Sequence, residues 1–350
     1  MNTSVFCSVL NLDHQLVWRW YREHLSGFRE SEASGEHYKH DLKKSDGENV
    51  RVPICKPENF GDSMAIDEKQ IGEEMHTIVS NRATGKIALM ARSMQYADLE
   101  KLLDRESLTC RQVETLTRDL SSLYAKVGKE LFFNSSPVAD KFHVIRSLMD
   151  ACQDVRVRLR QDLLRERRLA YQTHKKQEKE RKKACLAAGK EYVNQAFKYE
   201  EEELSNGETL LDALARSRYL LFKYSDQWTL SQSKRAEALF ERFPEIGKVY
   251  DRCCEFRDWI KKENVGRSIR LLKIELQGWM HKVEEDDIDE MLNFKSLIER
   301  NILPVLNYFR FGATNAIAEN INSRIQRFIM INQGTRDREF FYFRLGKYFS

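Results

Sequence analysis

The spacing of hydrophobic and polar positions divides the chain into a short helix, an α/β segment and a long helical segment. Residues 14–28 have apolar side chains on one side of a helix, and residues 29–62 are polar enough to predict a linker. Between residues 63 and 140 the pattern predicts five strands and two helices. The strands are expected at 64–71, 75–80, 86–91, 113–119 and 136–139, and the helices at 96–103 and 121–132. From residue 141 to about 300 the spacing is helical throughout.

This order of elements predicts an α/β fold with a mixed sheet. Three strands in succession form a meander, and each later strand follows a helix and returns through a crossover. We therefore expect the first and fourth predicted strands to lie side by side. The expected domains are an N-terminal helix and linker (1–62), the first part of a core (63–150), a helical insertion (151–303) and C-terminal helices that complete the core (304–350).

The overall composition says little about binding partners, whereas the distribution of charge along the chain says more. Hydrophobic residues make up 41% of 350 residues, enough for one large core with an insertion, and the net charge is only +4. Residues 155–183, however, contain twelve Lys or Arg against four Asp or Glu, an excess of +8. This stretch is either a solvated helical face or a tract that binds DNA phosphates. The candidate DNA-binding residues there are Arg165, Arg167, Arg168, Lys175 and Lys176.

The seven cysteines are unpatterned. None forms a Cys-x-x-Cys pair, so a zinc ribbon is not expected within this chain. An odd number of scattered cysteines favours a reducing cytosol. No apolar run approaches the length of a membrane span, and the N-terminus lacks the pattern of a signal peptide. These features predict a cytoplasmic protein with no membrane partner.

Three acidic residues are the strongest candidates for chemistry. Asp67 and Asp119 each stand at the end of a short β-type run, 64–67 and 113–119, and Glu319 lies on a helix near the C-terminus. Three converging carboxylates suit two hard divalent cations, Mg²⁺ or Mn²⁺, and so indicate phosphoryl transfer on nucleic acid. Each residue also has an ordinary interpretation. Asp67 is a turn residue, Asp119 caps the next helix, and Glu319 is an exposed helical residue.

Several neighbours of these acids are supporting candidates. Glu68 follows Asp67, and Asp140 closes the fifth predicted strand one turn before His143. The last two are either a helix cap and a surface histidine, or a pair that contacts a phosphate near the metal ions. Asn322 shares a helical face with Glu319. Arg324 and Arg327 continue that helix as a basic edge that we expect to lie along DNA.

Together these segments resemble the DDE transposases of bacterial insertion sequences, and among them the ISL-three family. The resemblance rests on Ile66-Asp67-Glu68, 117–124, 138–144, 307–310, 314–315, 319–325 and 336–345. It implies a ribonuclease H-like core with a large all-helical insertion between the second and third catalytic acids. It implies that Asp67, Asp119 and Glu319 are the catalytic, metal-binding triad, with two Mg²⁺ or Mn²⁺ ions. The expected activity is DNA strand cleavage and then attack by a 3′-hydroxyl.

The same resemblance implies roles for the supporting residues and for partners. Asp140 and His143 match an Asp-x-x-His feature of related transposases, and Asp140 competes with Asp119 as the second acid. Relatives carry an N-terminal zinc ribbon and helix-turn-helix, whereas only about 60 residues precede Asp67 here. We therefore expect a separately encoded protein to recognise the element ends, or the chain to be an inactive, truncated derivative that binds DNA as a regulator. Pairing of two DNA ends favours a homodimer.

Overall fold

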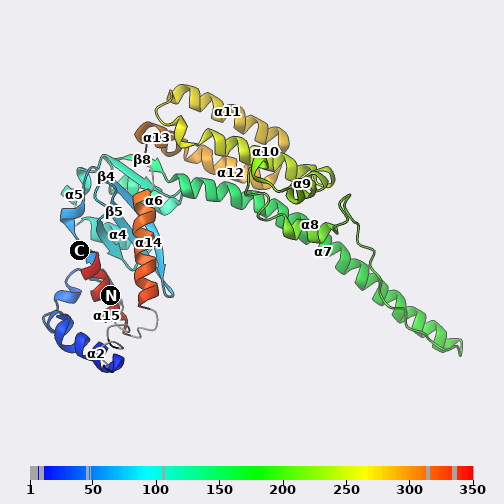
Figure 1. Cartoon of the computed structure of the whole chain (residues 1–350), viewed down its shortest axis with the longest axis horizontal. Helices are drawn as coiled ribbons and strands as arrows, with labels where there is room; N and C mark the ends of the chain where they lie inside the picture. Colours follow the sequence, from blue (N-terminus) through cyan, green and yellow to red (C-terminus); the bar gives the residue numbers. More distant parts are fainter. Residues whose placement is uncertain are drawn as a thin grey trace. The chain divides into compact units, whose positions relative to one another are not determined.

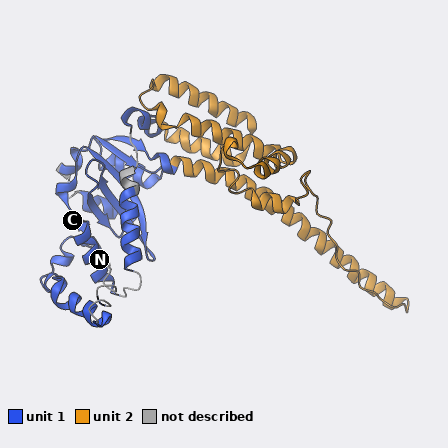
Figure 2. Cartoon of the chain, viewed as in Figure 1, with its two compact units in different colours: residues 1–143, 303–350 blue, residues 144–302 orange. Residues whose placement is uncertain are grey.

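The computed structural model describes residues 7, 12–44, 47, 49–104, 107–312, 316–332 and 337–349. The side chains of residues 104, 107–108 and 316–319 lie outside this description. The chain divides into two compact units, shown in two colours in Figure 2. Unit 1 contains residues 1–143 and 303–350, and unit 2 contains residues 144–302.

Unit 1 is built on a six-stranded mixed sheet with the strand order β3-β6-β5-β4-β7-β8 (Figure 1). Strands β4, β5 and β6 form an antiparallel meander, as expected. Strand β7 pairs with β4 in parallel, so the first and fourth predicted strands are neighbours. Strand β8 pairs with β7 in parallel. The strands are β3 Ile54–Cys55, β4 Ser63–Ile71, β5 Glu74–Asn81, β6 Ile87–Ala91, β7 Thr115–Arg118 and β8 Ser136–Ala139, and β1 Leu42–Lys43 pairs with β2 Asn49–Val50 apart from the sheet.

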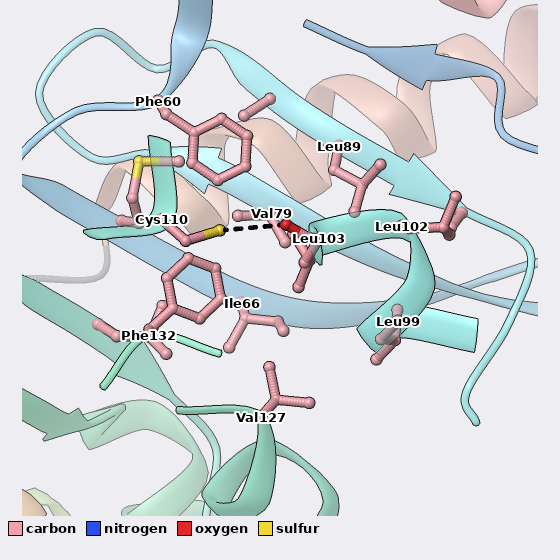
Figure 3. Packing of buried hydrophobic residues seen from close by; sticks show 14 of the residues in the cluster. Phe60, Ile66, Val79, Leu89, Leu99, Leu102, Leu103, Cys110, Val127 and Phe132 are labelled. Atoms are coloured by element: carbon pink, nitrogen blue, oxygen red, sulfur yellow. Dashed lines mark hydrogen bonds between the residues drawn. The ribbon is translucent and has the colours of Figure 1, made fainter. Parts of the chain in front are cut away.

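Alternation along the strands gives the sheet two buried faces. On the first face, Met64 and Ile66 of β4 pack with helices α4, α5 and α6 in the core drawn in Figure 3. On the second face, Ile71 of β4 packs with residues of α14 and α15, among them Ile325. Helix α13 is tied to the edge of the sheet by Asn307, whose Nδ2 donates to the Pro137 carbonyl at 2.8 Å. The helices are α4 Tyr96–Asp104, α5 Ser107–Arg111, α6 Ser122–Glu130, α13 Ile302–Phe311, α14 Ala316–Ile331 and α15 Arg338–Tyr348.

The N-terminal segment is folded, so the prediction that residues 29–62 form a linker was wrong. Strand β3 joins the main sheet, and Phe28 packs against Phe340 and Phe343 of α15. The polar composition led to the wrong prediction because several of these polar side chains are buried and form ion pairs. Arg51, for example, is only 4% exposed. The helices of this segment are α2 His14–Trp20, the π-helical turn Tyr21–Leu25 and α3 Phe28–Ala33.

Unit 2 is mostly helical, and its longest segment without a helix lies between α7 and α8. Helix α7 begins in unit 1 and continues into unit 2 for a total of 47 residues. The expectation of helix throughout was wrong for residues 188–209, because Gly189 has a φ of 64° and no helix forms again before α8. Trp228 packs against Phe240 and Tyr250, so it is a structural residue. The helices are α7 Lys141–Ala187, α8 Leu210–Arg216, α9 Leu230–Arg242, α10 Pro244–Trp259, α11 Ile269–Asp286 and α12 Asp289–Arg300.

A buried histidine on β5 should make the stability of the protein depend on pH. His76 is fully buried, its Nε2 lies 3.0 Å from the Tyr342 hydroxyl, and burial lowers its pKa from 6.5 to about 4. Between these two values the unfolded chain binds a proton that the folded protein does not. The free energy of unfolding should therefore fall by ~3 kcal/mol as the pH drops from 6.5 to 4. Urea denaturation across this range measures the effect. His76→Gln should flatten the profile, and an unchanged profile would contradict this account.

Candidate active site

Three aspartates lie in one row across the parallel part of the sheet. Ala65 of β4 pairs with Thr117 of β7, and Thr117 pairs with Val138 of β8. Asp67, Asp119 and Asp140 each follow one of these residues by two positions. Because side chains alternate with a period of two, all three aspartates belong to the same face and the same level of the sheet. This is the face covered by α14.

Asp67 does not end its strand, and that part of the prediction was wrong. It lies in the middle of β4, because β4 continues to Ile71 in its hairpin with β5. The pairing of β4 with β7 ends near Asp67. Its last pair of residues is Ala65 with Thr117. The carboxylate of Asp67 therefore stands where the sheet opens between β4 and β7.

His143 connects the outer members of the row. It lies in the first turn of α7, directly after β8, and its Nε2 is 3.6 Å from Asp67 Oδ1 and 3.6 Å from Asp140 Oδ2. The hydrogen bond to Asp67 raises the pKa of His143 against the effect of burial, and the charges of Asp140, Asp67 and Asp119 raise it further. A histidine in this place favours the protonated form and offsets repulsion among the carboxylates.

Asn322 connects helix α14 to Asp67. Its Nδ2 donates to Asp67 Oδ2 at 2.7 Å, and α14 packs against β4. The backbone amide of Glu68 donates to the other oxygen, Oδ1, at 2.8 Å. Burial by itself would raise the pKa of Asp67, but the hydrogen bonds from His143, Asn322 and Glu68 lower it below its usual value. Asp67 is therefore ionised at neutral pH.

The other two aspartates differ in exposure. Asp119 follows β7 directly and is partly exposed, and its Oδ1 accepts the amide of Ser121 at 2.9 Å. Ser121 is the cap of α6, so the interpretation of Asp119 as that cap was wrong. Asp140 is 4% exposed, and its Oδ1 accepts the amide of Phe142 at the start of α7. Asp119 is thus the more accessible of the two carboxylates.

Strand alternation places Glu68 relative to the row of aspartates, whereas the side chain of Glu319 is outside the described residues. Strand alternation directs Glu68 to the opposite face from Asp67, toward Tyr124, whose pKa is raised mainly by burial and further by the charge of Glu68. Glu68 contacts Asp67 through its backbone amide. The backbone of Glu319 belongs to α14, but its side chain lies outside the described residues. The convergence of Glu319 on the row therefore remains a prediction.

Sequence reasoning missed Arg82, which lies in the turn between β5 and β6. Its Nη1 donates to Ser63 Oγ at 3.1 Å, and burial lowers its pKa while the charge of Asp140 opposes that effect. The guanidinium thus adds positive charge near the row of aspartates. An arginine in a surface turn has no distinguishing pattern, so only the folded arrangement reveals it.

The predicted DNA-binding residues lie on two helices. On α7, Arg168, Lys175 and Lys176 are exposed. Arg165 pairs with Asp162, and Arg167 pairs with Glu201. On α14, Arg327 is exposed, whereas Arg324 lies over the rings of Tyr348 and Phe349. The ion pairs of Arg165 and Arg167 offset the positive charge available to a phosphate at these two positions.

Among the described residues, no three or more His, Cys, Asp or Glu side chains are grouped closely enough to hold a metal ion. The Glu319 side chain is not one of these residues. No helix in the described part of the chain combines the length and apolar character needed to cross a membrane.

A mixed sheet with this row of carboxylates, covered by a helix from the end of the chain, is compatible with a transposase fold. The model of the transposase family DDE_Tnp_ISL3 matches residues 64–345. The chain therefore belongs to this family, and the resemblance seen in the sequence is confirmed. Neither the curated proteins nor the solved structures contain a match to the chain. Membership implies DNA binding and, in general, DNA cleavage and strand transfer.

Proposed function

We propose that the protein is the transposase of an insertion sequence and that it cuts and joins DNA by two-metal-ion phosphoryl transfer. In this proposal unit 1 is a ribonuclease H-like core, and unit 2 is inserted between the second and third catalytic acids. One observation carries the proposal. Asp67 and Asp119 are level on neighbouring parallel strands, and α14 reaches Asp67 through the 2.7 Å hydrogen bond from Asn322.

The donor atoms fit hard divalent cations. Asp67 and Asp119 offer carboxylate oxygens on one face of the sheet, which are ligands that Mg²⁺ and Mn²⁺ prefer. Glu319 precedes Asn322 by three residues on α14, so both residues belong to one helical face. We therefore assign Asp67, Asp119 and Glu319 as the ligands. Two bound ions would supply activation of the attacking water or 3′-hydroxyl and stabilisation of the leaving oxygen.

The residues next to the proposed metal ligands orient the groups of this site. Asn322 and the Glu68 amide each hold one oxygen of Asp67, which fixes the orientation of the carboxylate. Asp140 caps the start of α7 and lies beside His143, so it orients the imidazole. A protonated His143 presents positive charge at the row and is placed to attract a DNA phosphate. Asp140 and His143 therefore act as positioning residues.

The same proposal assigns DNA contacts to Arg327 and to the basic tract of α7. Exposed Arg168, Lys175 and Lys176 suit backbone phosphates, which attract basic side chains without regard to sequence. Two copies of the chain are proposed to act together, because two DNA ends must be paired.

The test is Mg²⁺-dependent nicking of supercoiled plasmid DNA by the wild type and by Asp67→Asn, Asp119→Asn and Glu319→Gln. Each substitution removes a charged ligand and should eliminate nicking while the fold is retained. Asp150→Asn is the matched control, since Asp150 is an exposed residue of α7 paired only across one turn with Arg146. Equal nicking by the wild type and all three variants would refute the assignment.

A further inference from the structure

One face of α14 is exposed beside the aspartate row and is unusual in composition. Ser323, Gln326, Arg327, Met330 and Ile331 line a shallow depression of about 480 Å³. Met330 is 59% exposed and Ile331 is 72% exposed, although the opposite side of the helix is buried in the core of unit 1. Exposed large apolar residues beside an arginine indicate a surface that meets a partner.

Helical geometry connects this depression to the site. Gln326 follows Asn322 by four residues and Met330 follows it by eight, so the three side chains succeed one another along one side of the helix. Asn322 itself touches Asp67. With a rise of 1.5 Å per residue, Met330 lies about 12 Å farther along α14 than Asn322. A partner that reaches Asp67 and follows α14 would therefore meet Gln326 and then Met330.

The charges favour DNA as that partner. Arg327 is exposed and suits a phosphate, and Ser323 and Gln326 supply neutral hydrogen-bonding groups. Membership of a transposase family establishes that DNA is bound. Methionine is one of the apolar side chains that proteins insert between base pairs to unstack and kink a duplex. Along DNA, 12 Å corresponds to about three to four base steps.

We propose that α14 lies against DNA beside the cut site, and that Met330 inserts between bases about three to four steps from the scissile phosphate. Arg327 contacts a phosphate next to the insertion, and Ile331 packs at the edge of the opened step. The effect is to unstack the DNA close to the row of aspartates. This inference rests on the proposed function, because it takes the row as the place of cutting.

The test uses 2-aminopurine, a base whose fluorescence rises when it is unstacked. The probe is a 30-base-pair duplex with one nick that ends in a 3′-hydroxyl, and 2-aminopurine is placed at successive positions up to six steps from the nick. Ca²⁺ replaces Mg²⁺ so that the DNA is bound but not cut. The wild type should raise the fluorescence most at about three to four steps from the nick. Met330→Ala should reduce that rise by at least about threefold, and Met330→Leu should retain it.

Two further variants separate insertion from simple binding. Arg327→Gln should weaken binding and lower the slope of log affinity against log salt by about one. Met330→Ala should leave that slope unchanged, because methionine displaces no counterion. Leu271→Ala is the matched control, since Leu271 of α11 is an exposed apolar residue of unit 2, and it should change neither quantity.

Three results would overturn the insertion. The first is a full fluorescence rise with Met330→Ala, and the second is no rise with the wild type at any position. The third is sedimentation showing, without DNA, a dimer that Met330→Ala dissociates, because the occupant would then be a second copy of the chain.

The insertion and the proposed function can fail separately. Asp67→Asn should keep the wild-type fluorescence rise when the protein saturates the DNA, because the new amide oxygen can still accept the hydrogen bond from Asn322 that holds α14 at β4. If Asp67→Asn still nicks DNA while the rise is present, the proposed function fails, and insertion of Met330 stands without its assigned distance from the cut. If Asp67→Asn abolishes nicking but the wild type gives no rise at any position, the insertion fails and the proposed function stands.

Discussion

Asp119→Asn should lower the rate of Mg²⁺-dependent nicking by about 10³-fold or more, whereas Asp140→Asn should lower it by only about 10–100-fold. The reason is the order of the strands. Asp119 follows β7, which pairs directly with the strand of Asp67, and both aspartates lie two residues beyond the last pair of that ladder, Ala65 with Thr117. Asp140 follows β8, one strand farther away, and its carboxylate is occupied at the start of α7. Single-turnover nicking of plasmid DNA measures both rates.

A thermal unfolding curve for each variant is the necessary control for this comparison. Asp140 is buried and its charge faces His143, so Asp140→Asn should lower the melting temperature, while the partly exposed Asp119 should tolerate the change. The opposite kinetic order, with Asp140→Asn inactive and Asp119→Asn active, would assign the second metal ligand to Asp140. Bound Mn²⁺ located by crystallography would then lie next to His143.

Arg51→Ala should lower the free energy of unfolding by about 3 kcal/mol, because it leaves the largely buried Asp41 carboxylate without its partner. The Arg51 guanidinium donates to Asp41 Oδ1 at 2.7 Å and to Glu339 Oε2 at 2.8 Å. It also lies over the ring of Tyr38, with its central carbon 4.7 Å from the ring centroid. These contacts join the N-terminal segment to α15. Urea denaturation followed by circular dichroism measures the loss.

Arg29→Ala is the matched control for this prediction. Arg29 also pairs with two carboxylates, Glu23 and Glu32, but its side chain is 43% exposed. Water screens such pairs, so the change in stability should be much smaller than for Arg51. Equal losses for the two variants would show that burial does not determine the contribution of Arg51.

Much of unit 1 could be predicted because its signals are local. Alternating apolar residues and turn residues predicted the meander, and the helices between later strands predicted parallel pairing of β4 with β7. That pairing is enough to place Asp67 beside Asp119 from the sequence. The contact between Asn322 and Asp67 joins residues 255 positions apart, so only the family resemblance anticipated α14 at the site.

The wrong predictions have a common cause in tertiary contacts. Residues 29–62 resemble a linker because Arg51 and its partners are polar, but their pairing is visible only after α15 is in place. Arg82 was missed because a turn arginine carries no pattern. Sequence periodicity predicts elements well and long-range polar partners poorly.

The position of α14 near the end of the chain has a consequence for biosynthesis. Asp119 is followed by 196 residues before α14 begins at Ala316. At 5–20 residues per second, a ribosome needs roughly 10–40 s to make that segment. During that interval the strands that carry the aspartates exist without the helix that covers them. Under the proposed function, a nascent chain that has not reached Ala316 lacks the helix that carries Glu319 and Asn322, and translation that stops there should yield a product that does not nick DNA.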